Sequence, residues 1–124
     1  MEWGVGIDLE EIGKFEKALK TNKKFFARTF SKDEAKYCAS KSNPAVCFAG
    51  TFAAKESVFK AANSFDDGPK KIDDFEIVRS GAGAPIVRWV GSTPRKKNRP
   101  MVRVSISHAG DYAVALAVAM IGDT

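Results

Sequence analysis

The stretch that decides the fold is residues 45–63, AVCFAGTFAAKESVFKAAN. On a helical wheel of about 100° per residue, Phe48, Phe52 and Phe59 fall on one side together with several alanines. Such a stripe predicts a long helix, Ala45 to about Asn63, whose apolar side packs against a core. Glu56 is the exception, because the same step places it about 40° from Phe52, inside the stripe.

Before this helix the sequence predicts one strand and then shorter helices. Residues 2–8 alternate between an apolar face, formed by Trp3, Val5 and Ile7, and a nearly bare face, formed by Gly4, Gly6 and Asp8. A bare face allows another backbone or a ligand to come close. From Leu9 to Leu19 the repeat becomes helical, and a short helix through Phe25 and Phe26 follows. A capping box at Ser31–Glu34 then begins a helix to about Ser40.

After the long helix the sequence predicts only strands. A loop at residues 64–71 is followed by four strand patterns: Phe75–Arg79, Pro85–Val90, Val102–Ser107 and Tyr112–Met120. Because helices and strands are segregated along the chain, we expect a single α+β domain over residues 1–124. Its architecture would be an N-terminal strand, helices, and then antiparallel strands packed on the long helix.

The composition allows a polyanionic partner without choosing one. The net charge is +5 and the pI about 9.3, which suits nucleic acid, an anionic cofactor or an acidic protein. The densest basic run, Arg95-Lys96-Lys97, lies among loop residues and is either a solvated loop or a contact for anions. We find no membrane-spanning run and no signal-peptide layout. Cys38 and Cys47 form no metal or disulfide framework, so reduced thiols and a cytoplasmic location are expected.

Two acidic residues are candidates for chemistry. A carboxylate on an apolar helix face must be paired, protonated or metal-bound, and Lys60 is correctly spaced to pair with Glu56. Asp8 could equally be a helix N-cap. Together, however, Asp8 and Glu56 suit magnesium, which takes one or two carboxylates and completes its shell with waters and substrate phosphates. Lys55 and Lys60 would then offer positive charge to those phosphates.

His108 is the only histidine, and its position allows two interpretations. It follows the strand pattern Val104-Ser105-Ile106-Ser107, so it either caps the core or faces a ligand from the rim of the sheet. No P-loop, dinucleotide fingerprint, HExxH or GxSxG motif is present.

Three stretches together resemble the small bacterial-type holo-acyl-carrier-protein synthases, a branch of the 4′-phosphopantetheinyl transferases. They are Val5-Gly6-Ile7-Asp8; residues 52–61, FAAKESVFKA; and Val104–His108 followed by Tyr112–Ala115. The resemblance covers nearly the whole chain. It implies transfer of the 4′-phosphopantetheine arm of coenzyme A to a serine of an apo acyl carrier protein, with release of adenosine 3′,5′-bisphosphate.

The resemblance also implies roles for individual residues. Asp8 and Glu56 would hold Mg²⁺ against the coenzyme A pyrophosphate, and Lys60 would stabilise the leaving group. The implied coenzyme A contacts are Lys55, Lys60, Gly83, Pro85, Ser107 and His108. Thr51 and Ala84 stand where the family commonly has basic residues. Lys41 or the basic residues at 95–99 are candidates to compensate for them.

The resemblance further implies partners. An acidic acyl carrier protein would meet a basic face, for which Lys14, Lys17 and Arg28 are the candidates. A homotrimer with sites between subunits is expected, with neither nucleic acid nor a membrane as partner. Two rivals remain at this stage: a nucleic-acid-binding module using the 95–99 loop, and a catalytically dead homologue. Intact Asp8, Glu56 and Lys60 argue against the second.

Overall fold

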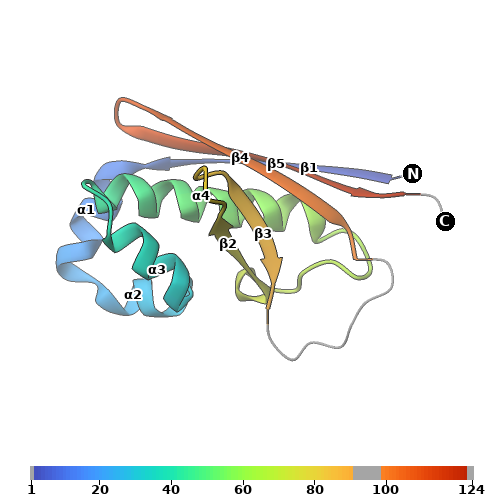
Figure 1. Ribbon diagram of the computed structural model, residues 1–124, viewed down its shortest axis with the longest axis horizontal. Helices are drawn as coiled ribbons and strands as arrows, with labels where there is room; N and C mark the ends of the chain where they lie inside the picture. Colours follow the sequence, from blue (N-terminus) through green and yellow to red (C-terminus); the bar gives the residue numbers. More distant parts are fainter. Residues whose placement is uncertain (1, 91–98, 123–124) are drawn as a thin grey trace.

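The fold is a three-stranded antiparallel sheet with one long helix lying against it (Figure 1). The structure is a computed structural model that describes residues 2–90 and 99–122. The helices are α1 (Ile12–Thr21), α2 (Lys23–Thr29), α3 (Lys32–Ala39), α4 (Pro44–Ala62) and the short 3-10 helix η1 (Ile72–Asp74). The strands are β1 (Glu2–Glu11), β2 (Phe75–Arg79), β3 (Pro85–Trp89), β4 (Met101–Ala109) and β5 (Tyr112–Ile121). The α+β expectation is confirmed.

The sheet has the order β1-β5-β4, and β2 and β3 form a separate hairpin. Helix α4 runs beneath the sheet, the helices α1–α3 pack below one end of α4, and the β2–β3 hairpin crosses beside it (Figure 1). The small residues of β5, Ala113, Ala115, Ala117 and Ala119, are buried on the α4 side. None of the helices in the described part of the chain could cross a membrane.

The glycines of β1 let α4 approach the sheet unusually closely. A Cβ atom on Gly4 would lie 1.9 Å from the carbonyl oxygen of Ala61, and one on Gly6 would lie 2.0 Å from that of Ser57. No side chain can occupy such gaps, so glycine is required by the space rather than by the backbone angles. The expected close approach on the bare face of β1 is confirmed.

The aromatic side of α4 does not face the sheet. Phe48 and Phe52 join the phenylalanines of α1 and α2 in one cluster of ring contacts, with Phe26 and Phe48 centroids 4.9 Å apart and Phe15 and Phe52 centroids 5.6 Å apart. Phe59, in contrast, packs against the core on the sheet side. Helix α4 therefore has two packed sides, a small-residue side against the sheet and an aromatic side against the other helices.

Strand β1 is longer than the sequence indicates. Leu9 was expected to begin a helix, but it pairs with Val114 and is 61% exposed. The ten-residue ladder with β5 overrides the local helical repeat, and α1 begins only at Ile12. Asp8 therefore lies within a strand and is not a helix cap, which excludes that interpretation. The other long elements start and end within about two residues of expectation, as is usual for such assignments, and the capping box at Ser31 and Glu34 is present.

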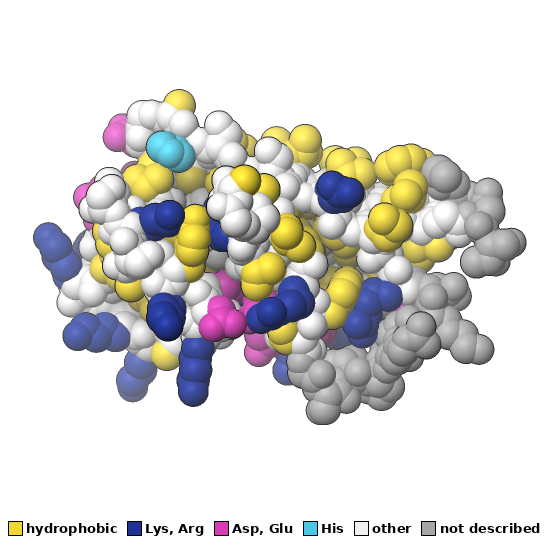
Figure 2. All heavy atoms as spheres, in the orientation of Figure 1, with side chains coloured by type: hydrophobic (Ala, Val, Ile, Leu, Met, Phe, Trp, Pro, Cys, Tyr) yellow, Lys and Arg dark blue, Asp and Glu magenta, His cyan; other side chains and the backbone are white. Residues whose placement is uncertain are grey.

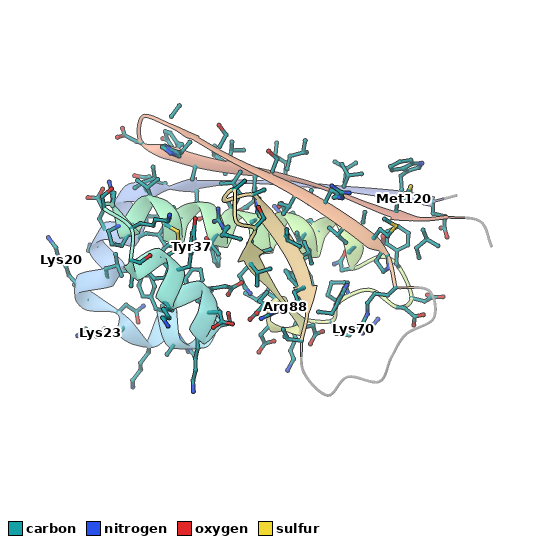
Figure 3. All side chains as sticks on the ribbon, viewed as in Figure 1. Lys20, Lys23, Tyr37, Lys70, Arg88 and Met120 are labelled. Atoms are coloured by element: carbon teal, nitrogen blue, oxygen red, sulfur yellow. A yellow bond between two sulfur atoms is a disulfide. The ribbon has the colours of Figure 1, made fainter. Side chains whose placement is uncertain are left out.

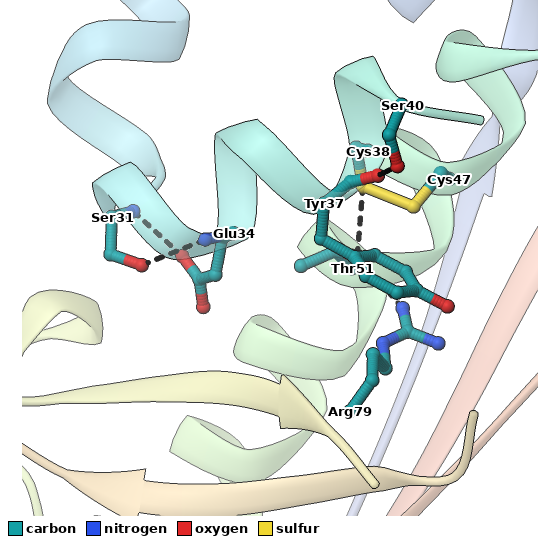
Figure 4. Close-up of a disulfide and its surroundings, with 8 residues drawn as sticks. All are labelled: Ser31, Glu34, Tyr37, Cys38, Ser40, Cys47, Thr51 and Arg79. Carbon is teal, nitrogen blue, oxygen red and sulfur yellow. Dashed lines mark hydrogen bonds between the residues drawn. A yellow bond between two sulfur atoms is a disulfide. The ribbon is translucent and has the colours of Figure 1, made fainter. Parts of the chain in front are cut away.

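The expectation of two reduced thiols is contradicted. Cys38 of α3 and Cys47 of α4 form a disulfide, with their Cα atoms 5.2 Å apart (Figure 4). The reason is geometric: α3 packs against the first turns of α4, which brings the two backbones within disulfide range. Sequence spacing alone does not reveal this proximity.

Candidate active site

Asp8 and Lys60 meet where β1 crosses α4. The Lys60 ammonium donates to the backbone carbonyl of Ile7 at 3.1 Å and lies 3.5 Å from Asp8 Oδ1. The second oxygen, Asp8 Oδ2, is buried and has no hydrogen-bond partner. A buried, partly unpaired carboxylate oxygen is costly unless something else binds it.

Glu56 lies close enough to Asp8 for the two charges to interact. Burial raises the pKa of Glu56, the negative charge of Asp8 raises it further, and Lys60 opposes both. The ion pair between Glu56 and Lys60 that the spacing allowed does not form, because the Lys60 ammonium contacts Asp8 instead. The expectation that Asp8, Glu56 and Lys60 share one site agrees with these contacts.

Glu10 also belongs to this acidic group, and the sequence reasoning missed it. Burial, the adjacent Asp8 carboxyl group, and the negative charges of Asp8 and Glu56 raise its pKa to about 8, while Lys14 acts in the opposite direction. The available signal was the two-residue alternation of β1, which places residue 10 on the same face as Asp8. It was overlooked because the strand was expected to end at Asp8.

Lys55 lies elsewhere, in the core, and its contacts there are with other residues of the protein. It is 1% exposed, and its ammonium donates to both oxygens of Glu34 at 3.1 Å and to the carbonyl of Phe75 at 3.1 Å. The other hydrogen bonds of Glu34 are accepted from Ser31 N and Ile77 N. With its charge and all three donors occupied inside the core, Lys55 ties α3, α4 and β2 together.

His108 lines a pocket of about 410 Å³ beside α4, together with Lys41 and Arg79. Figure 4 shows Arg79 directed at Thr51 and lying against Tyr37. Its Nη2 donates to Thr51 Oγ1 at 3.0 Å, and the guanidinium carbon lies 5.0 Å from the centre of the Tyr37 ring. His108 is exposed rather than capping the core, so the interpretation as a rim residue agrees with the structure.

The other residues expected to contact coenzyme A are Gly83, Pro85 and Ser107. Gly83 has a φ of 87° in the β2–β3 turn, a left-handed conformation that favours glycine. Pro85 begins β3 directly opposite Arg79. Ser107 is exposed and points to the sheet face opposite that of His108, since neighbouring strand residues alternate. Ser107 and His108 of one chain therefore do not line one pocket.

The basic loop falls mostly outside the described residues. Arg95, Lys96 and Lys97 lie in the part for which nothing is described, so their expected anion contact stays a prediction. Arg99 is described, and its guanidinium carbon lies 4.4 Å from the centre of the Trp89 ring.

Comparison with known proteins identifies the family. The family model described as the 4′-phosphopantetheinyl transferase superfamily matches residues 4–117. The chain belongs to this superfamily. Within it, the chain is 36% identical to the holo-[acyl-carrier-protein] synthase of Geobacter metallireducens, covering 95% of this chain and 97% of that protein. The chain is also 38% identical to fatty acid synthase subunit alpha of Candida parapsilosis, of which it spans only 6%.

Solved structures of the family share the fold. The "Chronobacterium ammoniagenes ACPS-CoA complex" superposes with a TM-score of 0.81 at 25% identity, covering 99% of this chain and 100% of that chain. The acyl carrier protein synthase of Mycobacterium tuberculosis superposes with a TM-score of 0.73 at 32% identity, covering 96% and 97%. The expected phosphopantetheinyl transferase of the holo-acyl-carrier-protein synthase type is confirmed. The rival nucleic-acid-binding module finds no support in these matches.

Proposed function

We propose that this protein transfers the 4′-phosphopantetheine arm of coenzyme A to a serine of an apo acyl carrier protein. The observation that carries the proposal is the convergence of Asp8, Glu56 and Lys60 where β1 crosses α4. The serine oxygen bonds to the phosphorus that bears the pantetheine arm, and the bond from that phosphorus to adenosine 3′,5′-bisphosphate breaks. The hydroxyl proton passes to water or to a carboxylate of the site.

Magnesium fits the residues of this site. Asp8 Oδ2 is a buried acceptor without a partner, and mutual repulsion with Glu56 leaves an excess of negative charge. Within the described residues no three acidic, histidine or cysteine side chains form a ready-made set of metal ligands. Two carboxylates are nevertheless enough for Mg²⁺, which retains several waters and binds substrate phosphates. Asp8 and Glu56 would hold the ion, and when bound it supplies neutralisation of phosphate charge.

Lys60 supplies a solvent-accessible positive charge at the same place. Its side chain is 52% exposed, in contrast to the 14% of Asp8. An ammonium that reaches solvent while touching a metal-ligand candidate can also contact an incoming diphosphate. We assign it the stabilisation of the leaving bisphosphate.

The site is proposed to lie between subunits of a homotrimer. Asp8 is on β1 and His108 is on β4, the two strands that flank β5, so the width of β5, about 10 Å from strand to strand, separates their backbones. The sheet face away from α4 is apolar and open. Its outward residues on β1, Trp3, Val5, Ile7 and Leu9, are 60–64% exposed, and Met101 and Leu116 add to it (Figure 2). An apolar face of this extent is typical of a protein interface.

The acidic carrier protein is proposed to dock on the helical end of the molecule. The expected contacts Lys14, Lys17 and Arg28 are exposed on α1 and α2, and Figure 3 shows Lys20 and Lys23 of the same region pointing into solvent. Lys14 also lines a pocket of about 270 Å³ with Phe25 and Phe52 that reaches Glu10. Because these basic residues lie beside the pocket that reaches Glu10, a carrier protein bound to them would present its serine to the reacting phosphate. Raising the salt concentration would weaken this docking.

The proposed location is the cytoplasm, and the proposed process is fatty acid biosynthesis.

The test of the proposed activity is to incubate the protein with coenzyme A, Mg²⁺ and an apo acyl carrier protein and to measure the intact mass of the carrier. We expect the carrier to gain one phosphopantetheine arm, and Glu56→Gln to lose the reaction by at least a hundredfold, as for loss of a main electrostatic group. Asp73→Asn, which removes an exposed acid of η1, is the matched control and should retain activity. Failure of several carriers to react would refute the proposal.

A further inference from the structure

The disulfide between Cys38 and Cys47 borders the pocket beside α4, and its two cysteines differ in access. Cys38 is 0% exposed, whereas Cys47 is partly exposed and lines the pocket. Thiol–disulfide exchange begins when a thiolate attacks one of the two sulfur atoms. An external thiolate therefore reaches this bond from the pocket, at Cys47.

The charge of the pocket favours thiols that are themselves anionic. Its lining includes Lys41, Arg79 and His108 and no acidic residue, so we call it the cationic pocket. A cleft lined by charges of one sign raises the local concentration of small ions of the opposite sign. An anionic thiol therefore meets Cys47 more often than a neutral thiol of the same reactivity does.

Thr51 and Arg79 stabilise the sulfur atom that would leave. Cys38 Sγ lies 3.5 Å from Thr51 Oγ1 (Figure 4). Because a disulfide sulfur carries no proton, the Thr51 hydroxyl is the donor in this contact. The same hydroxyl oxygen accepts a hydrogen bond from Arg79 Nη2 at 3.0 Å. A thiolate at Cys38 would accept a stronger, charge-assisted hydrogen bond, and a better stabilised thiolate leaves faster.

We propose that Cys47 is a modification site for small anionic thiols, which enter the cationic pocket and exchange with the disulfide. The incoming thiolate bonds to Cys47 Sγ while the bond to Cys38 Sγ breaks, and Cys38 leaves as a thiolate that takes a proton from water. A second thiolate then attacks the outer sulfur of the adduct, which releases the small disulfide and leaves Cys47 reduced. The same small disulfide reverses both steps, so the surrounding thiol pool sets the state of the pair.

The adduct on Cys47 would regulate the enzyme, and this consequence rests on the proposed function. The adduct occupies the pocket that also contains His108, an expected contact of coenzyme A. Its negative charge also cancels part of the positive charge there. The adduct therefore competes with coenzyme A, whereas the disulfide form leaves the pocket open.

The first test compares two thiols of similar size, anionic 2-mercaptoethanesulfonate and neutral 2-mercaptoethanol, as reductants of the wild-type protein. Alkylation and intact mass measure the rate of reduction. Dividing each rate by the rate for the protein unfolded in urea corrects for the reactivity of the thiol itself. The corrected rate should be about tenfold higher for the anionic thiol at low salt, and high salt should reduce the difference.

Variants test the two parts of the proposed site separately. Lys41→Met should lower the preference for the anionic thiol about two- to threefold. Lys36→Met, which removes an exposed positive charge of α3 outside the pocket, is the matched control and should keep the preference. Thr51→Val removes the donor to Cys38 and should slow reduction by both thiols about 2- to 10-fold. Equal corrected rates for the two thiols in wild-type protein would overturn the proposal.

The position of the adduct is a second test on the wild-type protein. Quenching the reaction with acid and then alkylating traps the mixed disulfide. Trypsin cleaves after Lys36, Lys41 and Lys55, so it puts Cys38 and Cys47 on different peptides. The small thiol should be found on Cys47 and the alkyl group on Cys38. The opposite distribution would overturn the proposal.

The regulatory consequence is measured on a stable adduct. Cys38→Ser treated with glutathione disulfide should gain one glutathione, and its KM for coenzyme A should rise about tenfold or more. Cys47→Ser given the same treatment is the control and should show no change in KM. An adduct that leaves the KM unchanged would overturn the regulation.

The exchange measurements separate this proposal from the proposed function, because they need neither coenzyme A nor a carrier protein. If exchange at Cys47 prefers the anionic thiol while no carrier is modified, the modification site stands and the transferase assignment fails. If transfer occurs but exchange shows no preference, the modification site fails alone.

Discussion

Glu10 carries the clearest pH dependence among the described side chains. Its pKa of about 8 in the fold compares with 4.5 for an unperturbed side chain. A carboxyl group with a raised pKa stabilises the fold below pH 4.5, and this contribution is lost as the pH rises through about 8. The metal-free protein should therefore become less stable between pH 5 and 8.5, a range chosen to bracket that transition.

Thermal unfolding in EDTA across this range tests the effect. Glu10→Gln should flatten the decline and raise the melting temperature at the alkaline end, because a neutral amide replaces a crowded carboxylate. Glu16→Gln on the exposed surface of α1 is the control and should keep the wild-type profile. A Glu10→Gln profile that falls as steeply as wild type would contradict the prediction.

Lys55 and Lys60 are two lysines of one helix with opposite expected effects. Lys55→Met leaves Glu34 charged in the core without its partner, which should cost about 3–5 kcal/mol in the free energy of unfolding. Lys60 is 52% exposed, so Lys60→Met should change stability by less than about 1 kcal/mol while impairing phosphopantetheine transfer. Urea denaturation and the carrier mass assay measure the two effects separately.

A double variant distinguishes the unpaired charge from simple loss of packing. Adding Glu34→Gln to Lys55→Met removes the stranded charge while keeping a side-chain acceptor for the capping box. Part of the lost stability should return. If the double variant is as unstable as the sum of its single changes, the buried charge is not the cause.

At the scale of elements, the close packing of β1 against α4 sets the position of Asp8. A Cβ atom on Gly6 would lie 2.0 Å from Ser57 O, so Gly6→Ala must push the strand from the helix and should cost at least about 1–3 kcal/mol. Gly13→Ala in α1 is the matched control, because nothing lies within 4 Å of its Cβ position. That change should instead stabilise the fold by about 0.5–1 kcal/mol. Urea denaturation of both variants measures these changes in the free energy of unfolding. If Gly6→Ala left the free energy of unfolding unchanged, the close packing of β1 against α4 would be refuted.

The disulfide between α3 and α4 gives a second prediction at this scale. It closes a short loop with a sequence separation of 9, for which loop entropy corresponds to about 2–3 kcal/mol. Reduction of the purified protein should lower the melting temperature accordingly. Alkylation of the denatured protein without reductant should leave its mass unchanged, and two adducts would show free thiols instead. A cytoplasmic protein would be reduced in the cell, so alkylation of cell extracts measures the working state.

Local repeats predicted most element boundaries, but not which surfaces meet. The capping box predicted the start of α3, and a continuous apolar run predicted β5, since both signals depend on neighbouring residues. The end of β1 could not be read locally, because pairing with β5 overrides the helical repeat at Leu9. The same limit explains Glu10, which the shortened strand hid, and Lys55, whose partner Glu34 lies 21 residues earlier in the chain.

At the scale of the whole molecule, the two halves of the site lie on opposite sides of β5. Asp8 and Glu10 of the acidic group are on β1, and the cationic pocket is beside β4. Coenzyme A would have to bridge them, and the open apolar face of the sheet offers a way to bring β1 of one subunit beside β4 of another. Each active site would then contain Asp8 and Glu56 from one chain and Arg79 and His108 from its neighbour.

Mixing two inactive variants tests this arrangement. Glu56→Gln impairs the acidic half, and the double variant Arg79→Met/His108→Ala impairs the cationic half. If sites form between subunits, refolding the two variants together should restore about one quarter of wild-type activity, because one interface in four joins two intact halves. Light scattering should report a trimer for each sample. A mixture that stays inactive although mixed trimers form would place both halves of the site within a single chain.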